Sequence, residues 1–303
     1  MVFFNALPGA VAEGLIWGLM AIGVYISYKI LDIADLTVDG SICTGGCVCA
    51  ILITRGVPVY LSVIIAFLAG ALAGIVTGLL HTALGIPSIL AGILTQLMLY
   101  SVNLAIMGGR SIASFVGGNY SLMLSMRDNI SAMLVAGGII AATIICLWLF
   151  FYTEVGLTLK STGDNPDMSR AQGINVKLNK VIGLAISNGI VALAGALYAQ
   201  YKGSANINDG RGAIVVGLAA IFIGLSVSLK IKPNFVVSLI GVVGGGVIYY
   251  IIYNFVILLG LNTSYLKMLS AIIVVIFLAV PYIKGEYFKK QKPIPETGGD
   301  ADA

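Results

Sequence analysis

Amides and hydroxyls set within long apolar segments are the side chains of this sequence best placed to do chemistry. They exchange hydrogen bonds with a solute or with a neighbouring helix. Seven are candidates for lining a polar pathway: Ser41, Thr95, Gln96, Asn103, Asn188, Gln200 and Ser226. A long amide at lipid depth is costly without a partner, which favours Gln96 and Asn188. The alternative for each residue is a structural hydrogen bond between packed helices.

The sequence offers few residues that could form a metal site or a catalytic acid–base pair. Cys43 and Cys47 would share a helix face, but the single histidine, His81, is far away in sequence and nothing nearby supplies further ligands. We therefore predict no metal site and interpret both cysteines as small residues packed between helices. The phosphate-binding loop and the His-Glu-x-x-His and Gly-x-Ser-x-Gly motifs do not occur. We expect neither an enzyme nor a cofactor bound to this chain.

The composition indicates that a membrane positions these residues. Of the 303 residues, 59% are hydrophobic and 10% are charged, against about 25% charged in an ordinary soluble domain. The charges gather between apolar stretches, and a stretch of roughly 20 residues spans a bilayer. The net charge of +4 is too small and too local to indicate nucleic acid binding. We expect an all-α, multi-pass bundle in a membrane.

About nine membrane segments are predicted within a transmembrane domain at 1–284, followed by a disordered cytoplasmic tail at 285–303. The segments are Gly9–Tyr28, Leu36–Thr54, Val57–Leu80, Ile86–Met107, Ser131–Tyr152, Lys180–Tyr201, Gly212–Leu229, Phe235–Leu259 and Leu266–Ile283. Retention of basic residues in the cytoplasm places three clusters there: Lys160 with Arg170 and Lys177, Lys230 with Lys232, and Lys284 with Lys289, Lys290 and Lys292. The N-terminus then lies outside and the C-terminus inside.

A short internal repeat and regularly spaced glycines describe the expected packing. In each copy a helix ends in Tyr-Lys and is followed by a polar connection and Asp-Gly, with the aspartates at Asp39 and Asp209. The two copies have opposite orientations in the predicted topology, which is typical of an inverted repeat; the alternative is chance similarity between Gly-rich helices. Gly70, Gly74 and Gly78 form a small-residue motif that predicts close helix contact.

Acidic residues do not occur in the predicted segments from Val57 onward, and Glu13 and Asp39 lie near segment ends. Proton- and sodium-coupled carriers usually keep acidic residues near the centre of the bilayer. A transporter built in this way would be a passive pathway or would be driven by a partner.

The linker that follows the fifth segment carries the signals of a short capped helix. Asn165 suits the N-cap, Pro166 the first helical position and Asp167 the positive end of the helix dipole. Gly173 suits the residue just past the C-terminus. A helix of about two turns is unstable alone in water, so we expect it to dock against a protein. The alternative is a solvated surface turn.

These motifs resemble a known family. The linker is similar to the coupling segment of ABC importer permeases of the branched-chain amino acid, ribose and nucleoside type, here at about 154–178. Asp32–Ser41 and Gly163–Asn175 resemble a subgroup often linked to aromatic amino acid uptake, and Gly210–Gly217 resembles a Gly-rich element of the second half. The resemblance implies a permease dimer made with a second copy, two ATPase subunits that hold ATP and Mg, and an extracellular lipid-anchored solute-binding protein.

The resemblance also assigns residues. It implies that the ATPase contact comprises Gly163, Asp164, Asn165, Pro166, Asp167, Met168, Arg170 and Gly173. It implies breaks near Leu36–Gly46 and Asn206–Gly217, which bring irregular backbone to the pathway. We expect the permease subunit of an importer for an amino acid, with aromatic ones favoured. The alternatives are a permease for a ribose-like sugar or a nucleoside, and a secondary carrier or facilitator that works alone.

Overall fold

Long apolar helices that run in alternating directions make up most of this computed structural model. It describes residues 2–115, 122–228 and 234–258, and the single positions 268, 271, 272, 275 and 279. The elements are α1 (Val2–Tyr25), the π-helical turn η1 (Ile26–Ile30), α2 (Val38–Thr54), α3 (Val59–Thr82), α4 (Ser88–Ile106), β1 (Ile112–Ser114), α5 (Asn129–Phe151), α6 (Glu154–Asp164), α7 (Pro166–Ala171), α8 (Val176–Lys202), β2 (Ser204–Asn206), α9 (Ala213–Ser228) and α10 (Phe235–Leu258).

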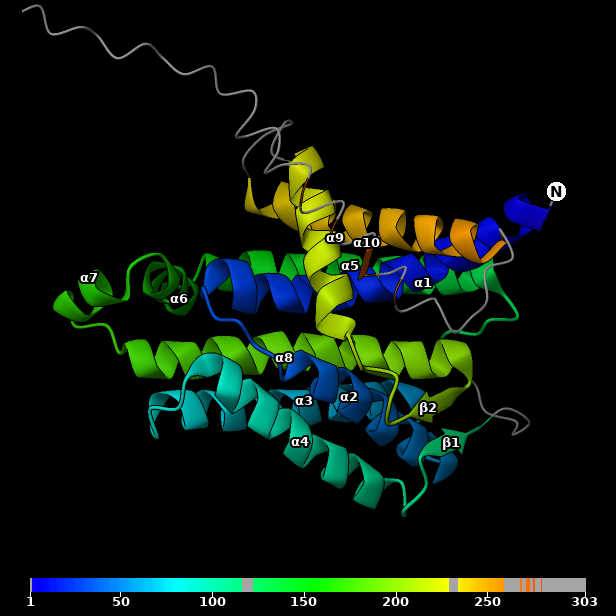
Figure 1. Cartoon of the computed structure of the whole chain (residues 1–303), viewed down its shortest axis with the longest axis horizontal. Helices are drawn as coiled ribbons and strands as arrows, with labels where there is room; N and C mark the ends of the chain where they lie inside the picture. Colours follow the sequence, from blue (N-terminus) through cyan, green and yellow to red (C-terminus); the bar gives the residue numbers. More distant parts are fainter. Residues whose placement is uncertain are drawn as a thin grey trace, which may run out of the picture.

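Several of the long helices share one axis. Figure 1 shows α1, α8 and α10 extended along that axis, whereas α9 crosses it. Helices α1 and α10 pack together, as do α3 and α8, and α9 lies against both α1 and α10. The helices α6 and α7 lie at one end, which we call the α7 end, and the two strands lie at the other, which we call the β end (Figure 1).

Six described helices are long and apolar enough to cross a membrane: Leu7–Ile30, Val59–Thr82, Ser88–Ile106, Asn129–Phe151, Val176–Lys202 and Phe235–Ile257. The shorter apolar helices Val38–Thr54 and Ala213–Ser226 match two further predicted segments. The ninth, Leu266–Ile283, lies almost entirely outside the described residues, as do the tail and the two basic clusters that begin at Lys230 and Lys284. The predicted all-α membrane bundle is therefore confirmed, whereas the count of nine is not.

Close approach of helices explains the spaced glycines. A Cβ atom on Gly74 of α3 would overlap the carbonyl oxygen of Leu184 on α8, and one on Gly78 would lie 2.9 Å from the Cα of Val181. On α1, a Cβ on Gly14 would lie 2.7 Å from the Cα of Val247 on α10. These backbones can touch only because the side chain is missing, as the small-residue motif predicts.

Two short strands join distant parts of the chain at the β end. Strands β1 and β2 pair antiparallel, with Ala113 opposite Ala205. Gly108 and Gly109 turn the chain between α4 and β1, with φ of +64° and +79°. The strand pair was not predicted, because three-residue strands carry no periodic pattern.

Candidate functional site

The predicted capped helix is present as α7. The Asn165 side chain accepts a hydrogen bond from the Met168 backbone N–H at 3.0 Å, and Pro166 occupies the first turn. Gly173 has a φ of +79°, the left-handed conformation that glycine adopts past a helix end. The helix spans Pro166–Ala171 and is thus shorter than the two turns expected. Its local signals were sufficient to predict where it begins and ends.

A second helix, α6, precedes it and was missed. Its N-cap is Thr153, whose hydroxyl accepts from the Gly156 N–H at 3.3 Å. One residue of its inner face, Leu159, is fully buried, and a Cβ on Gly156 would overlap the backbone at Phe150. The residues Val155, Leu157 and Leu159 alternate in a short polar stretch, so the pattern is too brief to separate a helix from a loop.

Hydrogen bonds fix α7 to α6, and α6 to the bundle. The Ser169 and Ser161 hydroxyls lie 3.0 Å apart, and the Asn179 amide donates to the Thr162 hydroxyl at 3.0 Å. A Cβ on Gly163 would overlap the carbonyl oxygen of Ile30 in η1. Helix α6 is therefore held against both α8 and η1, and α7 is held against α6.

Most of the exposed residues among the predicted coupling residues lie on α7 and at the two positions just before it. Asp164, Asn165, Asp167, Met168 and Arg170 are exposed. The Met168 side chain is 60% exposed, and beside it Arg170 donates to the Asp167 carboxylate at 3.1 Å. An exposed methionine next to a charged pair is suited to an interface, because thioethers adapt to the surface they meet. Gly163 differs from the others, since it faces η1 rather than solvent.

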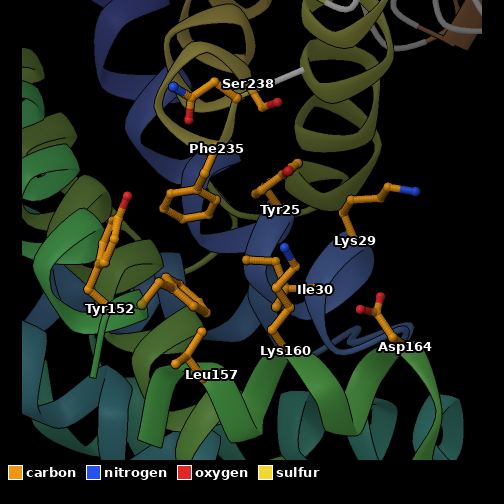
Figure 2. Close-up of a pocket in the computed structure, with 11 residues that line it drawn as sticks. Tyr25, Lys29, Ile30, Tyr152, Leu157, Lys160, Asp164, Phe235 and Ser238 are labelled. Carbon is orange, nitrogen blue, oxygen red and sulfur yellow. The ribbon is translucent and has the colours of Figure 1, made fainter. Parts of the chain in front are cut away.

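A cavity of about 430 Å³ lies where α6 meets the membrane helices. Figure 2 shows residues from three parts of the chain that line it: Tyr25, Lys29 and Ile30 from α1 and η1, Leu157 and Lys160 from α6, and Phe235 and Ser238 from α10. The rings of Phe151 and Phe235 are 4.9 Å apart and tie the end of α5 to the start of α10. A movement of α6 would change the shape of this cavity first.

A buried polar cluster lies deeper in the bundle. The Ser41 hydroxyl donates to the Asn188 side-chain oxygen at 2.6 Å, and the Asn188 amide donates to the Asp35 carboxylate at 2.6 Å. The second Asp35 oxygen accepts from the Thr37 N–H at 2.9 Å. Asp35 is only 3% exposed, although the sequence placed it in a loop. The structure thus joins two predicted pathway residues to a carboxylate that was not predicted.

Irregular backbone passes through the bundle in two places. The segments 31–37 and 203–212, the second of which contains β2, connect η1 to α2 and α8 to α9. They begin five and three residues before the predicted breaks at Leu36–Gly46 and Asn206–Gly217 and overlap them in part. Asp39 joins them, because its carboxylate accepts from the N–H groups of Gly212 at 2.8 Å and Ile214 at 2.9 Å. This carboxylate therefore caps the start of α9 across the bundle.

Replacing Asn188 with Leu should destabilise the bundle. Asp35 would remain buried with one hydrogen-bond donor fewer, and a loss of this kind costs about 2 kcal/mol. Thermal unfolding in detergent checks this expectation. The matched control is Asn254→Leu, because in the described part of the chain the Asn254 amide donates to the Tyr250 carbonyl of its own helix. Equal melting temperatures for the two variants would contradict the expectation.

A second polar site opens between α2 and α4. It is a cavity of about 410 Å³. Its lining includes Asp39, Gln96, Tyr100, Asn103 and Arg211. The predicted residues Gln96 and Asn103 thus line one cavity, together with the acidic Asp39 and the basic Arg211.

The remaining predicted pathway residues lie elsewhere. Thr95 and Ser226 donate to carbonyl oxygens of their own helices, at 3.0 and 2.6 Å. Gln200 is fully buried and accepts from the Met123 N–H at 3.2 Å, which fastens the chain before α5 to the end of α8. Of these three residues, only Gln200 bonds to another part of the chain in the described structure, as the structural alternative expects.

The residues weighed as metal ligands are engaged in other contacts. The Cys43 sulfur accepts from the Gly210 N–H at 3.0 Å and donates to the Ile207 carbonyl at 3.3 Å. The His81 Nε2 lies 3.3 Å from the Lys180 Nζ.

Comparison with known proteins identifies the family. The model of the branched-chain amino acid transport system permease component matches residues 9–278. The chain belongs to this permease family. Permeases of this family are the membrane components of ABC importers, and this permease is a multi-pass protein of the bacterial plasma membrane. No solved structure matches the chain.

Relatives of this permease carry different substrate names. A tyrosine transport system permease protein from Clostridioides difficile is 39% identical over 275 residues, which cover 91% of each chain. A ribose import permease protein from Haemophilus influenzae is 23% identical over 260 residues, 85% of this chain and 79% of the relative. An autoinducer 2 import system permease protein from Salmonella typhimurium is 26% identical over 208 residues, 68% of this chain and 58% of the relative.

Proposed function

We propose that this permease imports an amino acid, with aromatic ones such as tyrosine favoured, and that separate ATPase subunits drive the import through α7. The observation that carries the proposal is the capped helix Pro166–Ala171, fixed through α6 to η1 and α8, with Met168 exposed on it. ATP and Mg belong to the ATPase subunits. An extracellular lipid-anchored solute-binding protein delivers the substrate.

The placement of the coupling residues supports this mechanism. A subunit that docks on α7 meets an element whose movement reaches η1 and α8, because Gly163 and Asn179 hold α6 against them. The cavity in Figure 2 gives α6 room to shift against α1 and α10. The α7 end then faces the cytoplasm and the β end faces outside, as the basic clusters of the sequence predict.

An inverted repeat within the bundle is part of the proposal. Helix α1 packs on α10, and α8 packs on α3, so the first helix of each half contacts the third helix of the other half. Each first helix is followed by irregular backbone and then a short apolar helix, α2 or α9. Reciprocal packing of this kind is expected when two halves are related by a twofold axis in the membrane plane. A second copy of the permease completes the pathway.

The substrate preference rests on the relative named for tyrosine transport, which is 39% identical. The relative named for ribose import is 23% identical and supports the second candidate, a sugar or nucleoside permease. A cell that lacks this permease and receives it back should regain uptake of labelled L-tyrosine. Unlabelled L-phenylalanine in excess should compete and ribose should not. Uptake blocked by ribose or adenosine and indifferent to aromatic amino acids would contradict the amino acid assignment.

A further inference from the structure

We propose that the cavity between α2, α4 and the segment before α9 is a transit site for the amino acid, where Arg211 binds the substrate carboxylate and Asn103 accepts a hydrogen bond from its ammonium group. The inference rests on the proposed function and deepens it, since it names the residues that meet each end of the substrate. The cavity lies toward the β end, at the side of the bundle where α4 and β2 are labelled in Figure 1.

Asn103 supplies an acceptor that the protein leaves unused. Its side chain is 1% exposed, and its Oδ1 atom has no hydrogen-bond partner within the part of the chain that the structure describes. Buried polar atoms are almost always paired, so an unpaired acceptor on a residue that lines a cavity is available to a ligand. An ammonium group is a suitable donor, because a charged donor strengthens the hydrogen bond.

Arg211 supplies a cation that neighbouring acids do not neutralise. The oxygens of Asp39 already accept from the backbone at Gly212 and Ile214, and Asp209 is paired with Lys202 at 3.0 Å. Within the described ranges, the Arg211 guanidinium forms no ion pair. A guanidinium binds a carboxylate through two parallel hydrogen bonds, which gives direction as well as attraction.

The rest of the cavity suits an aromatic side chain. Tyr100 and Leu97 form its apolar wall, and the volume is about 410 Å³. Aromatic rings pair favourably when offset or edge-on, so Tyr100 can receive the ring of the substrate. Ribose and nucleosides carry no carboxylate and would leave Arg211 unmatched. The charges of this cavity therefore favour amino acids over both alternatives.

Saturation-transfer NMR on the full permease–ATPase complex in nanodiscs tests the site, since the method detects weak binding. The probes are L-phenylalanine and phenethylamine, which has the same ring and ammonium group but no carboxylate. We expect L-phenylalanine to bind about tenfold more tightly, the effect of one charge-assisted hydrogen-bonded pair. Arg211→Gln should remove that preference. Asn103→Leu should weaken both probes together.

The matched control is Arg110→Gln, which removes the same charge from an exposed turn outside this cavity. Arg211→Lys, which keeps the charge without the paired geometry, should retain an intermediate preference. Equal binding of the two probes to the unaltered protein, or an Arg211→Gln variant that still prefers L-phenylalanine, would overturn the site. If these binding tests fail but the complete importer still takes up tyrosine, the transit site is wrong and the proposed function stands. If the complete importer does not take up tyrosine, the proposed function itself is wrong.

Discussion

Replacing Met168 and Arg170 together with Asp should abolish assembly of the permease with its ATPase. Both side chains are exposed on α7, and Met168 is the larger apolar surface there. A buried charge in place of a central apolar contact costs at least about 2 kcal/mol, which is a roughly 30-fold loss of affinity. The second substitution also turns the Asp167–Arg170 pair into a cluster of like charges. Co-purification of the two subunits measures the effect.

A matched pair of residues at the opposite end provides the control. Met126 and Arg127 are adjacent and exposed near the start of α5. The same double replacement there should leave ATPase co-purification unchanged, because these residues lie at the β end. Both double variants should insert and melt like the unaltered protein, since neither site is buried. If the α7 variant still binds the ATPase and retains coupled ATP hydrolysis, the assignment of α7 as the docking helix is wrong.

Replacing Gly74 with Ile should lower the melting temperature of the bundle by roughly 5–10 °C. The new side chain would meet the backbone of α8 at Leu184 and Ala185, which cannot rotate away as a side chain could. Overpacking of this kind costs about 3 kcal/mol, and each kcal/mol shifts the midpoint by a few degrees. Thermal unfolding in detergent, followed by fluorescence, measures the shift.

The control is the same substitution at Gly138 on α5, which reports the effect of replacing a helical glycine with isoleucine where no described neighbouring helix is in contact. A Cβ at Gly138 would meet no atom within 4 Å in the described structure, so Gly138→Ile should change the midpoint little. The difference between the two variants isolates the contact between α3 and α8. Equal midpoints for Gly74→Ile and the unaltered protein would mean that these helices do not pack as closely as described.

Features governed by neighbouring residues could be predicted from the sequence. The cap at Asn165, the turn at Gly173 and the apolar helices all depend on chemistry within a few positions. The spacing of Gly70, Gly74 and Gly78 indicated a close contact, although it could not identify α8 as the partner. Helix α6 was missed because its burial depends on η1, α5 and α8 rather than on a strong pattern of its own.

Features governed by distant contacts could not be predicted. Asp35 lies in a stretch that reads as a loop, and it is buried because Asn188, 153 positions later, reaches it. The same holds for Asp39, which caps a helix that begins more than 170 positions away. Pathway residues were predicted by side-chain type and length alone, so Asn103 could not be told apart from Thr95 and Ser226, which bond to their own helices.

Transport by the purified permease in sealed vesicles tests the central claim most directly. The proposed mechanism assigns the pathway to this permease, the coupling to α7 and the source of energy to other subunits. Labelled tyrosine should therefore accumulate against its gradient only when the ATPase, ATP and the solute-binding protein are all present. Accumulation by the permease alone, driven by a proton or sodium gradient, would contradict the account.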